Sequence, residues 1–131
     1  MHNIQPQEII IMPSYVDGFV IPVPKANIEV YKRVAKKASK VWKDHGALAY
    51  FECVGDDLDV KDMTPFPKLA KAKEDEVVIF SWAVFRSRKD RDKANMAIMS
   101  DPRMAGMMEG CKDIFNPKRM AYGGFKVIVE A

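Results

Sequence analysis

The sequence predicts an α+β fold of the ferredoxin-like kind, a βαββαβ sandwich with a four-stranded antiparallel sheet and both helices on one face. Two observations predict it: the order strand, helix, strand in each half of the chain, and the run VVIFSWAVF at residues 77–85. A strand with one wet face would alternate apolar and polar residues, so this one is expected to be covered on both sides. Two helices cover one face, and a second copy of the chain is expected on the other, giving a dimeric α+β barrel.

The first strand is expected at residues 15–23, YVDGFVIPV, which is rich in β-branched and aromatic residues and closed by prolines. A helix follows, with Asn27 as its N-cap and Glu29 in its first turn. Its apolar residues recur at spacings of three and four and the helix ends near His45 and Gly46. Residues 47–54, ALAYFECV, form the second strand.

The second half begins with a long irregular link at residues 56–76, acidic first and basic after Pro67, of a length typical of lids and binding loops. After the strand at 77–85, Ser87 caps a helix, with Asp90 in the position of a capping box. Asp101-Pro102 interrupts this helix, and a short helical piece follows at 104–109. The last strand is expected at 120–129, where two adjacent glycines mark a bulge or a close backbone approach.

Composition predicts a single domain at residues 14–131, preceded by an N-terminal extension or extra strand at 1–13, with Met12 as an alternative natural start. Hydrophobic residues at 48% and charged residues at 30% exclude a disordered or membrane-embedded chain, and no run of apolar residues could span a bilayer. The formal charge of +3 makes a nucleic-acid partner unlikely. No export signal precedes Cys53 and Cys111, which are expected to be free thiols in a reducing cytoplasm.

Polar residues inside apolar strands are the candidates for chemistry, because burying them costs free energy unless they are paired. Asp17 and Glu52 are candidate general bases, the alternative being a cross-strand pair with Lys126. Arg103 could hold a carboxylate or phosphate, or form a fork to Asp101. Asn95 completes the catalytic candidates.

Aromatic residues on the strands could wall a ligand pocket, although packing explains each of them singly. These residues are Tyr15, Tyr50, Trp82 and Tyr122. His45 is a further ligand-binding candidate, and its place at a helix C-terminus also explains it. No metal is expected, since the aspartates of the link lack the glycine turn and closing glutamate of a calcium loop. No cofactor is expected, because no nucleotide-binding or metalloprotease motif is present.

Several motifs in register resemble the bacterial DUF1428 family: YVDGFVIPVPKAN at 15–27, FSW at 80–82, SRKDRDKAN at 87–95, DPRM at 101–104 and RMAYGGF at 119–125. The resemblance spans residues 15–130 and implies a dimeric α+β barrel whose biochemical function is unestablished. Within that superfamily it brings to mind cofactor-free monooxygenases of aromatic substrates, and haem-degrading enzymes with an Asn, Trp, His set. This chain offers Trp82, but Asn95 replaces the His, which argues against haem degradation.

Three hypotheses about function follow. The first is a small-molecule binding protein or cofactor-free, monooxygenase-like enzyme, with its pocket in the barrel. The alternative is a non-catalytic dimeric structural or interaction module, in which Asp17, Glu52 and Arg103 are exposed or tied in ordinary salt bridges. A weaker third option is RNA or polyanion binding by the basic face of the first helix, formed by Lys32, Arg33, Lys36, Lys37, Lys40 and Lys43.

Overall fold

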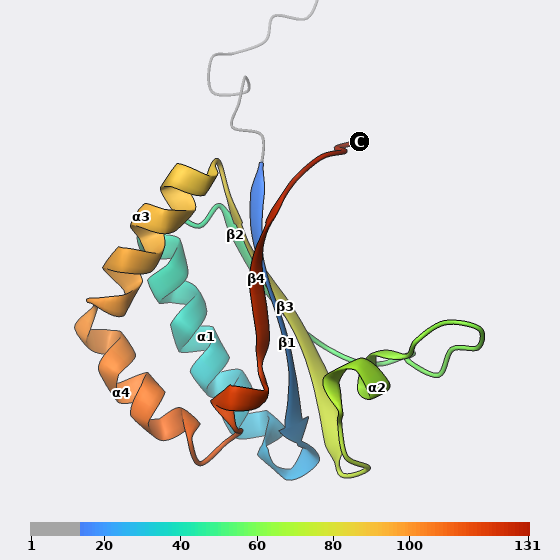
Figure 1. The fold of residues 1–131 in the computed structure, drawn as a ribbon. Helices are drawn as coiled ribbons and strands as arrows, with labels where there is room; N and C mark the ends of the chain where they lie inside the picture. The colour runs from blue at the N-terminus through green and yellow to red at the C-terminus, as the bar shows by residue number, and fades with distance from the viewer. Residues whose placement is uncertain (1–13) are drawn as a thin grey trace, which may run out of the picture.

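The computed structural model describes residues 14–131, and the extra strand predicted within residues 1–13 lies outside them. Four strands form one antiparallel sheet in the order β2-β3-β1-β4. The strands are β1 (Tyr15–Pro24), β2 (Ala49–Val54), β3 (Glu76–Phe85) and β4 (Ala121–Lys126). The predicted fold class is therefore confirmed, with both predicted helices on one face of the sheet (Figure 1).

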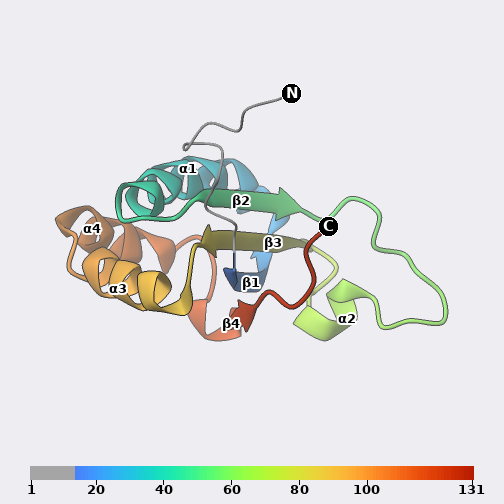
Figure 2. The same ribbon diagram turned by 90° about the horizontal axis from the view of Figure 1, so that it is seen from above.

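Three helices cover that face: α1 (Ile28–Asp44), α3 (Arg88–Met99) and α4 (Pro102–Cys111). Figure 2 shows the sheet edge-on, with these helices on one side and the short helix α2 (Phe66–Ala70) on the other. Two 3₁₀ turns, η2 (Lys25–Asn27) and η3 (Pro117–Arg119), lead into α1 and β4. In the part of the chain that the structure describes, no helix is both long and apolar enough to cross a bilayer.

The strand bounds differ from the predicted ones in ways that the pairing explains. β1 continues through Pro22 and Pro24, paired with β3 on one side. On the other side its partner β4 reaches only as far as Val20, so no strand there needs the N–H groups that the two prolines lack. β2 begins at Ala49, two residues after the predicted start, and the preceding Ala47 is buried in the core. β4 ends at Lys126, three residues before the predicted end.

Helix ends confirm one predicted cap and correct another. The Ser87 hydroxyl accepts a hydrogen bond from the Asp90 N–H at 3.1 Å, whereas the Asp90 carboxylate binds Arg86 instead of closing a capping box. Asn27 precedes α1, but its side-chain amide donates to the Ile114 carbonyl at 2.8 Å and caps nothing. The helical piece predicted at 104–109 is the longer α4, whose N-cap is Asp101.

The core between sheet and helices consists of two clusters. One packs the C-terminal part of α1 and helices α3 and α4 around Ala83 and Phe85 of β3. The other packs the start of α1 and the segment after α4 around Ile21 and Ile79. A cavity described below is lined by residues of both clusters, so the helix-facing side of the sheet is well packed at its ends and hollow between them.

Candidate functional site

The structure divides the predicted site residues into separate groups. Glu52 lies on β2, facing α1, and meets the predicted Tyr50 of the same strand. Tyr15, Asp17, Asn95 and Tyr122 meet around Arg91. His45 and Arg103 meet at Asp101, and Trp82 lies on the opposite face of the sheet beside Phe51. Within the described residues, the predicted site residues therefore do not line one common pocket.

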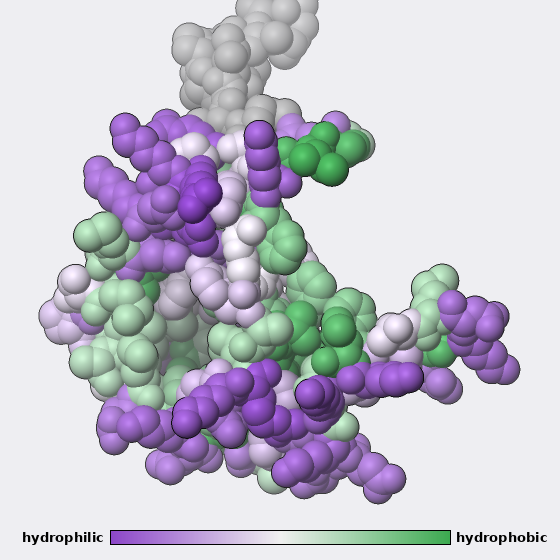
Figure 3. Space-filling model, viewed as in Figure 1, coloured by the Kyte–Doolittle hydropathy of each residue, from purple (hydrophilic) through white to green (hydrophobic). Residues whose placement is uncertain are grey.

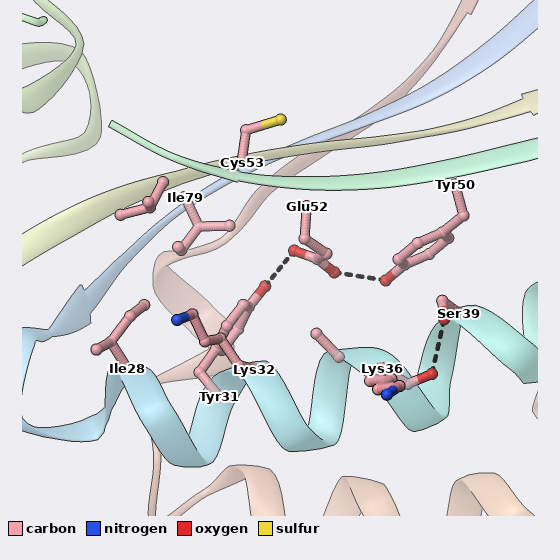
Figure 4. Close-up of a pocket in the computed structure, with 11 residues that line it drawn as sticks. Ile28, Tyr31, Lys32, Lys36, Ser39, Tyr50, Glu52, Cys53 and Ile79 are labelled. Atoms are coloured by element: carbon pink, nitrogen blue, oxygen red, sulfur yellow. Dashed lines mark hydrogen bonds between the residues drawn. The ribbon is translucent and has the colours of Figure 1, made fainter. Parts of the chain in front are cut away.

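The Glu52 carboxylate is held by two tyrosine hydroxyls (Figure 4). Tyr31 on α1 donates to Oε1 at 2.7 Å, and Tyr50, two residues away on the same strand face, donates to Oε2 at 2.5 Å. Burial, and secondly the charge of Glu52, raise the pKa of both tyrosines well above the ordinary value. Both hydroxyls therefore keep their protons at neutral pH and fix the carboxylate between helix and sheet.

Two hollows, each of about 290 Å³, meet at this carboxylate. The outer hollow opens between β2 and α1, and the Lys32 and Lys36 side chains stand on its rim. The inner cavity lies between the sheet and the helices, and its mouth shows in Figure 3 as a hollow between α4 and β4. Tyr31, Tyr50 and Glu52 line both hollows and form the partition between them.

The inner cavity has an apolar wall that is unusually rich in sulfur. Five methionines and one cysteine line it: Met99, Met104, Met107, Met108, Met120 and Cys111. Methionine side chains are flexible and polarisable, and they contact aromatic rings favourably. Burial raises the pKa of the Cys111 thiol, which favours its uncharged form. The polar side-chain groups on the wall are those of Glu52, Ser81 and the flanking tyrosines and tryptophan, so a bound molecule would be mainly apolar with few hydrogen-bonding groups.

Asp17 lies on the central strand β1, facing α3, and its side chain is fully buried. Arg91 of α3 donates to Oδ1 at 2.9 Å, and the Tyr122 hydroxyl donates to Oδ2 at 3.1 Å. Arg91 also donates to the Tyr15 hydroxyl at 3.2 Å, and Asn95 donates to the Tyr122 hydroxyl at 3.1 Å. Burial raises the pKa of Asp17 above its ordinary value, while Arg91, Tyr122 and Asn95 oppose that rise.

This group is closed on itself. The predicted alternative partner Lys126 pairs across the sheet with Tyr15 and not with Asp17. Arg91 has its Nε, Nη1 and Nη2 atoms engaged by Asp92, Asp17, Tyr122 and Tyr15, and its guanidinium lies 4.8 Å from the centre of the Tyr15 ring. The group therefore ties α3 to β1 and β4, and it leaves Asp17 no free side to meet a ligand.

Arg103 forms the fork to Asp101 that the sequence offered as an alternative, with Nη2 to Oδ2 at 2.7 Å and Nε to Oδ1 at 3.0 Å. His45 meets the same carboxylate at 2.8 Å, and Arg103 reaches back to Asp44 at 2.8 Å. Arg103, followed by His45, holds the pKa of Asp101 below its ordinary range. These contacts join the end of α1 to the start of α4.

Sequence reasoning missed two of the residues that matter here. Tyr31 belongs to the apolar stripe that the sequence predicts for the first helix, but its hydroxyl donates to Glu52 on β2. Arg91 is one of several charged residues of α3, and it lies three residues before the buried Ala94 and seven before the buried Ile98. That spacing places Arg91 on the buried face of α3, and could have marked it.

The comparisons with known proteins agree with this architecture. The family model described as a protein of unknown function, DUF1428, matches residues 14–115. The uncharacterized protein YbaA of Escherichia coli (strain K12) is 43% identical over 117 residues, which cover 89% of this chain and 98% of that protein.

Among solved structures, a dimeric ferredoxin-like protein from an uncultured marine organism matches with a TM-score of 0.60 and 12% identity, over 92% of this chain and all of that one (100%). A conserved Bacteroides thetaiotaomicron protein of unknown function, described as a possible oxidoreductase, matches with a TM-score of 0.56 and 13% identity, over 88% of this chain and 100% of that one. At these identities the structures show the fold alone. The family match and the YbaA relative together show that the chain belongs to the DUF1428 family.

Proposed function

We propose that the inner cavity binds a small, largely apolar and aromatic molecule that carries one hydroxyl group, and that Glu52 accepts the hydrogen bond from this hydroxyl. The observation that carries the proposal is a carboxylate fixed by Tyr31 and Tyr50 at the wall of a cavity otherwise lined by methionine and aromatic side chains. A cavity of about 290 Å³ lies at the small end of the range for ligand sites, which suits a molecule of one or two rings.

The test compares 2-naphthol with naphthalene, two fluorescent probes that differ by one hydroxyl. A hydrogen bond to a charged group contributes about 1.5–3 kcal/mol, so 2-naphthol is expected to bind about tenfold or more tightly than naphthalene. The Glu52→Gln variant keeps the side-chain shape and is expected to lose most of this preference. Glu74→Gln, at an exposed position outside the cavity, is the matched control. Equal affinity for both probes, or no binding of either, contradicts the proposal and favours a non-catalytic module.

Cofactor-free oxidation of an electron-rich phenol is the reaction class that such a site could support. The possible oxidoreductase among the structural neighbours favours it as a second candidate. With a hydroquinone, Glu52 would take one phenolic proton, and molecular oxygen would take two electrons from the resulting phenolate. Oxygen would also take the second phenolic proton and the one held by Glu52, which gives the quinone and hydrogen peroxide. Oxygen uptake with 1,4-dihydroxynaphthalene, compared between the wild type and Glu52→Gln, separates an enzyme from a binding protein.

We further propose that the chain acts as a homodimer in a reducing, cytoplasmic compartment. The dimeric ferredoxin-like neighbour and the exposed apolar residues on the face of the sheet opposite the helices, such as Phe51 and Phe80, support the dimer. The two free cysteines support the compartment, since Cys53 is exposed on the sheet and forms no disulfide. Light scattering on the purified protein measures the dimer directly.

A further inference from the structure

The face of the sheet opposite the helices is apolar and open in the single chain. Its aromatic side chains stack in sequence: Phe51 on Trp82 with ring centres 4.9 Å apart, and Phe80 edge-on to Trp82 at 5.4 Å. Phe51 remains 48% exposed, and Phe125 on the edge strand β4, on the same face but separated from β3 by β1, is 63% exposed. An open apolar surface of this kind marks an interaction site. We call this surface, formed by Phe51, Phe80, Trp82 and Phe125, the back face.

Residues 55–75, which we call the arm, project on the same side of the sheet as the back face (Figures 1 and 2). The arm is anchored at its base. Phe66 of α2 packs edge-on against Phe80 with ring centres 6.0 Å apart. Arg119 forms two hydrogen bonds to the Glu76 carboxylate, at 2.7 and 2.9 Å, and donates a third to the Lys71 carbonyl at 2.8 Å. α2 is therefore held at a fixed angle to the sheet.

The arm exposes apolar side chains that nothing in the described chain covers. Met63 is 77% exposed and Leu69 is 63% exposed, and Phe66 connects them to the back face. Apolar side chains held in water contribute no stability to the fold, whereas a partner surface that packs on them gains free energy from their burial. The arm and the back face, joined by the contact of Phe66 with Phe80, therefore offer neighbouring apolar surfaces to a partner.

The charges of the arm indicate which partner. Residues 56–62 carry four aspartates against one lysine, and residues 63–73 carry three lysines and no acid, before Glu74 and Asp75 at the base of the arm. These side chains are all exposed: Asp56, Asp57, Asp59, Asp62, Lys61, Lys68, Lys71, Lys73, Glu74 and Asp75. In a two-fold dimer the same patch meets its own copy in reverse, so a surface with separated positive and negative halves is complementary to itself. In a second copy of this chain, the positive part of one arm can face the negative part of the other.

We infer that the arm is a clamp that closes over a second copy of the chain seated on the back face. The inference rests on the proposed homodimer and adds to it the element that holds the partner. In each protomer the side chains of Met63 and Leu69 pack on the other copy, which explains their exposure in the single chain.

The experiment measures dimer dissociation by sedimentation equilibrium. Met63→Glu and Leu69→Glu each place a charge in the proposed contact, and each is expected to raise the dimer Kd about tenfold or more. Met96→Glu is the matched control, because Met96 is 76% exposed on α3, on the helix side of the sheet, and this variant is expected to keep the wild-type Kd. Phe51→Glu tests the back face itself, and circular dichroism checks the fold of every variant.

The outcomes separate the two proposals. A wild-type chain that stays monomeric at high concentration overturns both the homodimer and the clamp, and leaves the surface to a different protein. A dimer that Phe51→Glu dissociates but that Met63→Glu and Leu69→Glu leave intact overturns the clamp alone. Should Leu69→Glu unfold α2, Met63→Glu still decides, because Met63 lies in the loop before that helix.

Discussion

Gly124 illustrates how one residue makes a buried ion pair possible. A side-chain carbon at this position of β4 would lie 2.6 Å from the Tyr15 hydroxyl and 2.8 Å from Nη1 of Arg91. Because Gly124 has no side chain, the Arg91 guanidinium has room to reach Asp17. Of the two predicted readings of the glycine pair, the close approach is thus confirmed at Gly124, while the unbroken β1–β4 register shows no bulge.

Arg91→Met tests how the chain tolerates Asp17 in its core. Removing one partner of a buried pair costs about 3–5 kcal/mol, because the other charge is left uncompensated. The folded-state pKa of Asp17 is already raised, and without Arg91 it rises further. A group whose pKa is raised in the folded state stabilises the folded protein fully at pH values below its unfolded-state pKa. This contribution is lost as the pH rises through its folded-state pKa. The free energy of unfolding of the variant, from urea titrations, should therefore fall more steeply than that of the wild type as the pH rises above about 4, the ordinary pKa of an aspartate.

Asp17→Asn in the Arg91→Met background is the control for this experiment. Because the amide does not ionise, the double variant should lose the extra pH dependence and recover part of the stability. A pH profile of Arg91→Met that parallels the wild type would show that Asp17 is not the titrating group.

At the scale of elements, Asp101 joins α1 to α4. Its Oδ1 accepts from the Arg103 N–H at 2.9 Å as the N-cap of α4, and its Oδ2 meets His45 at the C-terminus of α1. Asp101→Asn keeps a good capping side chain but loses the charge, whereas Asp101→Ala loses both. The expected order of stability is wild type, then Asn, then Ala, with amide hydrogen exchange faster in α4 in the same order. Equal exchange in all three would mean that α4 is held by its packing alone.

The sequence predicts those elements whose signals are local. The Ser87 cap, the 3.6-residue period of α1 and the apolar run of β3 each act within a few residues, and each is present in the structure. Two wrong predictions depend on distant parts of the chain. The Asn27 side chain binds the carbonyl of Ile114, 87 residues away, instead of capping α1. β4 is shorter than predicted because its partner β1 begins at Tyr15, opposite Lys126. The helix α2 within the predicted loop is five residues long, too short to show a period.

The same distinction explains the candidate site. Glu52 could be singled out because a carboxylate in an apolar strand is unusual, whatever it contacts. Its partner Tyr31 lies 21 residues away, and Arg91 lies 74 residues from Asp17, so neither contact follows from spacing within one element. Strand alternation predicts that Trp82 shares one side of β3 with Phe80, but it does not tell which side the helices cover. The sequence could therefore not separate the pocket residues of the two faces.

At the scale of the whole molecule, one sheet serves two surfaces with different tasks. The side facing the helices encloses the cavity and the Asp17 group, and the back face remains open to a partner. Since the strands alternate, no residue of the sheet belongs to both surfaces. Substitutions on the back face are therefore expected to change assembly while leaving the Glu52 site intact.

Trp82 reports on that back face without any added label. The chain has two tryptophans, and Trp42→Phe leaves Trp82 alone. This change removes no hydrogen bond, because the buried Nε1 of Trp42 has no partner among the described residues. If a second copy covers the back face, dilution from micromolar to nanomolar concentration should shift the Trp82 emission to longer wavelength as water reaches the ring. The shift should follow the fall in mass measured by sedimentation, and the Met63→Glu substitution should move both curves together to higher concentration. An emission maximum that stays constant while the mass halves would place the dimer contact away from Trp82, on some other surface of the chain.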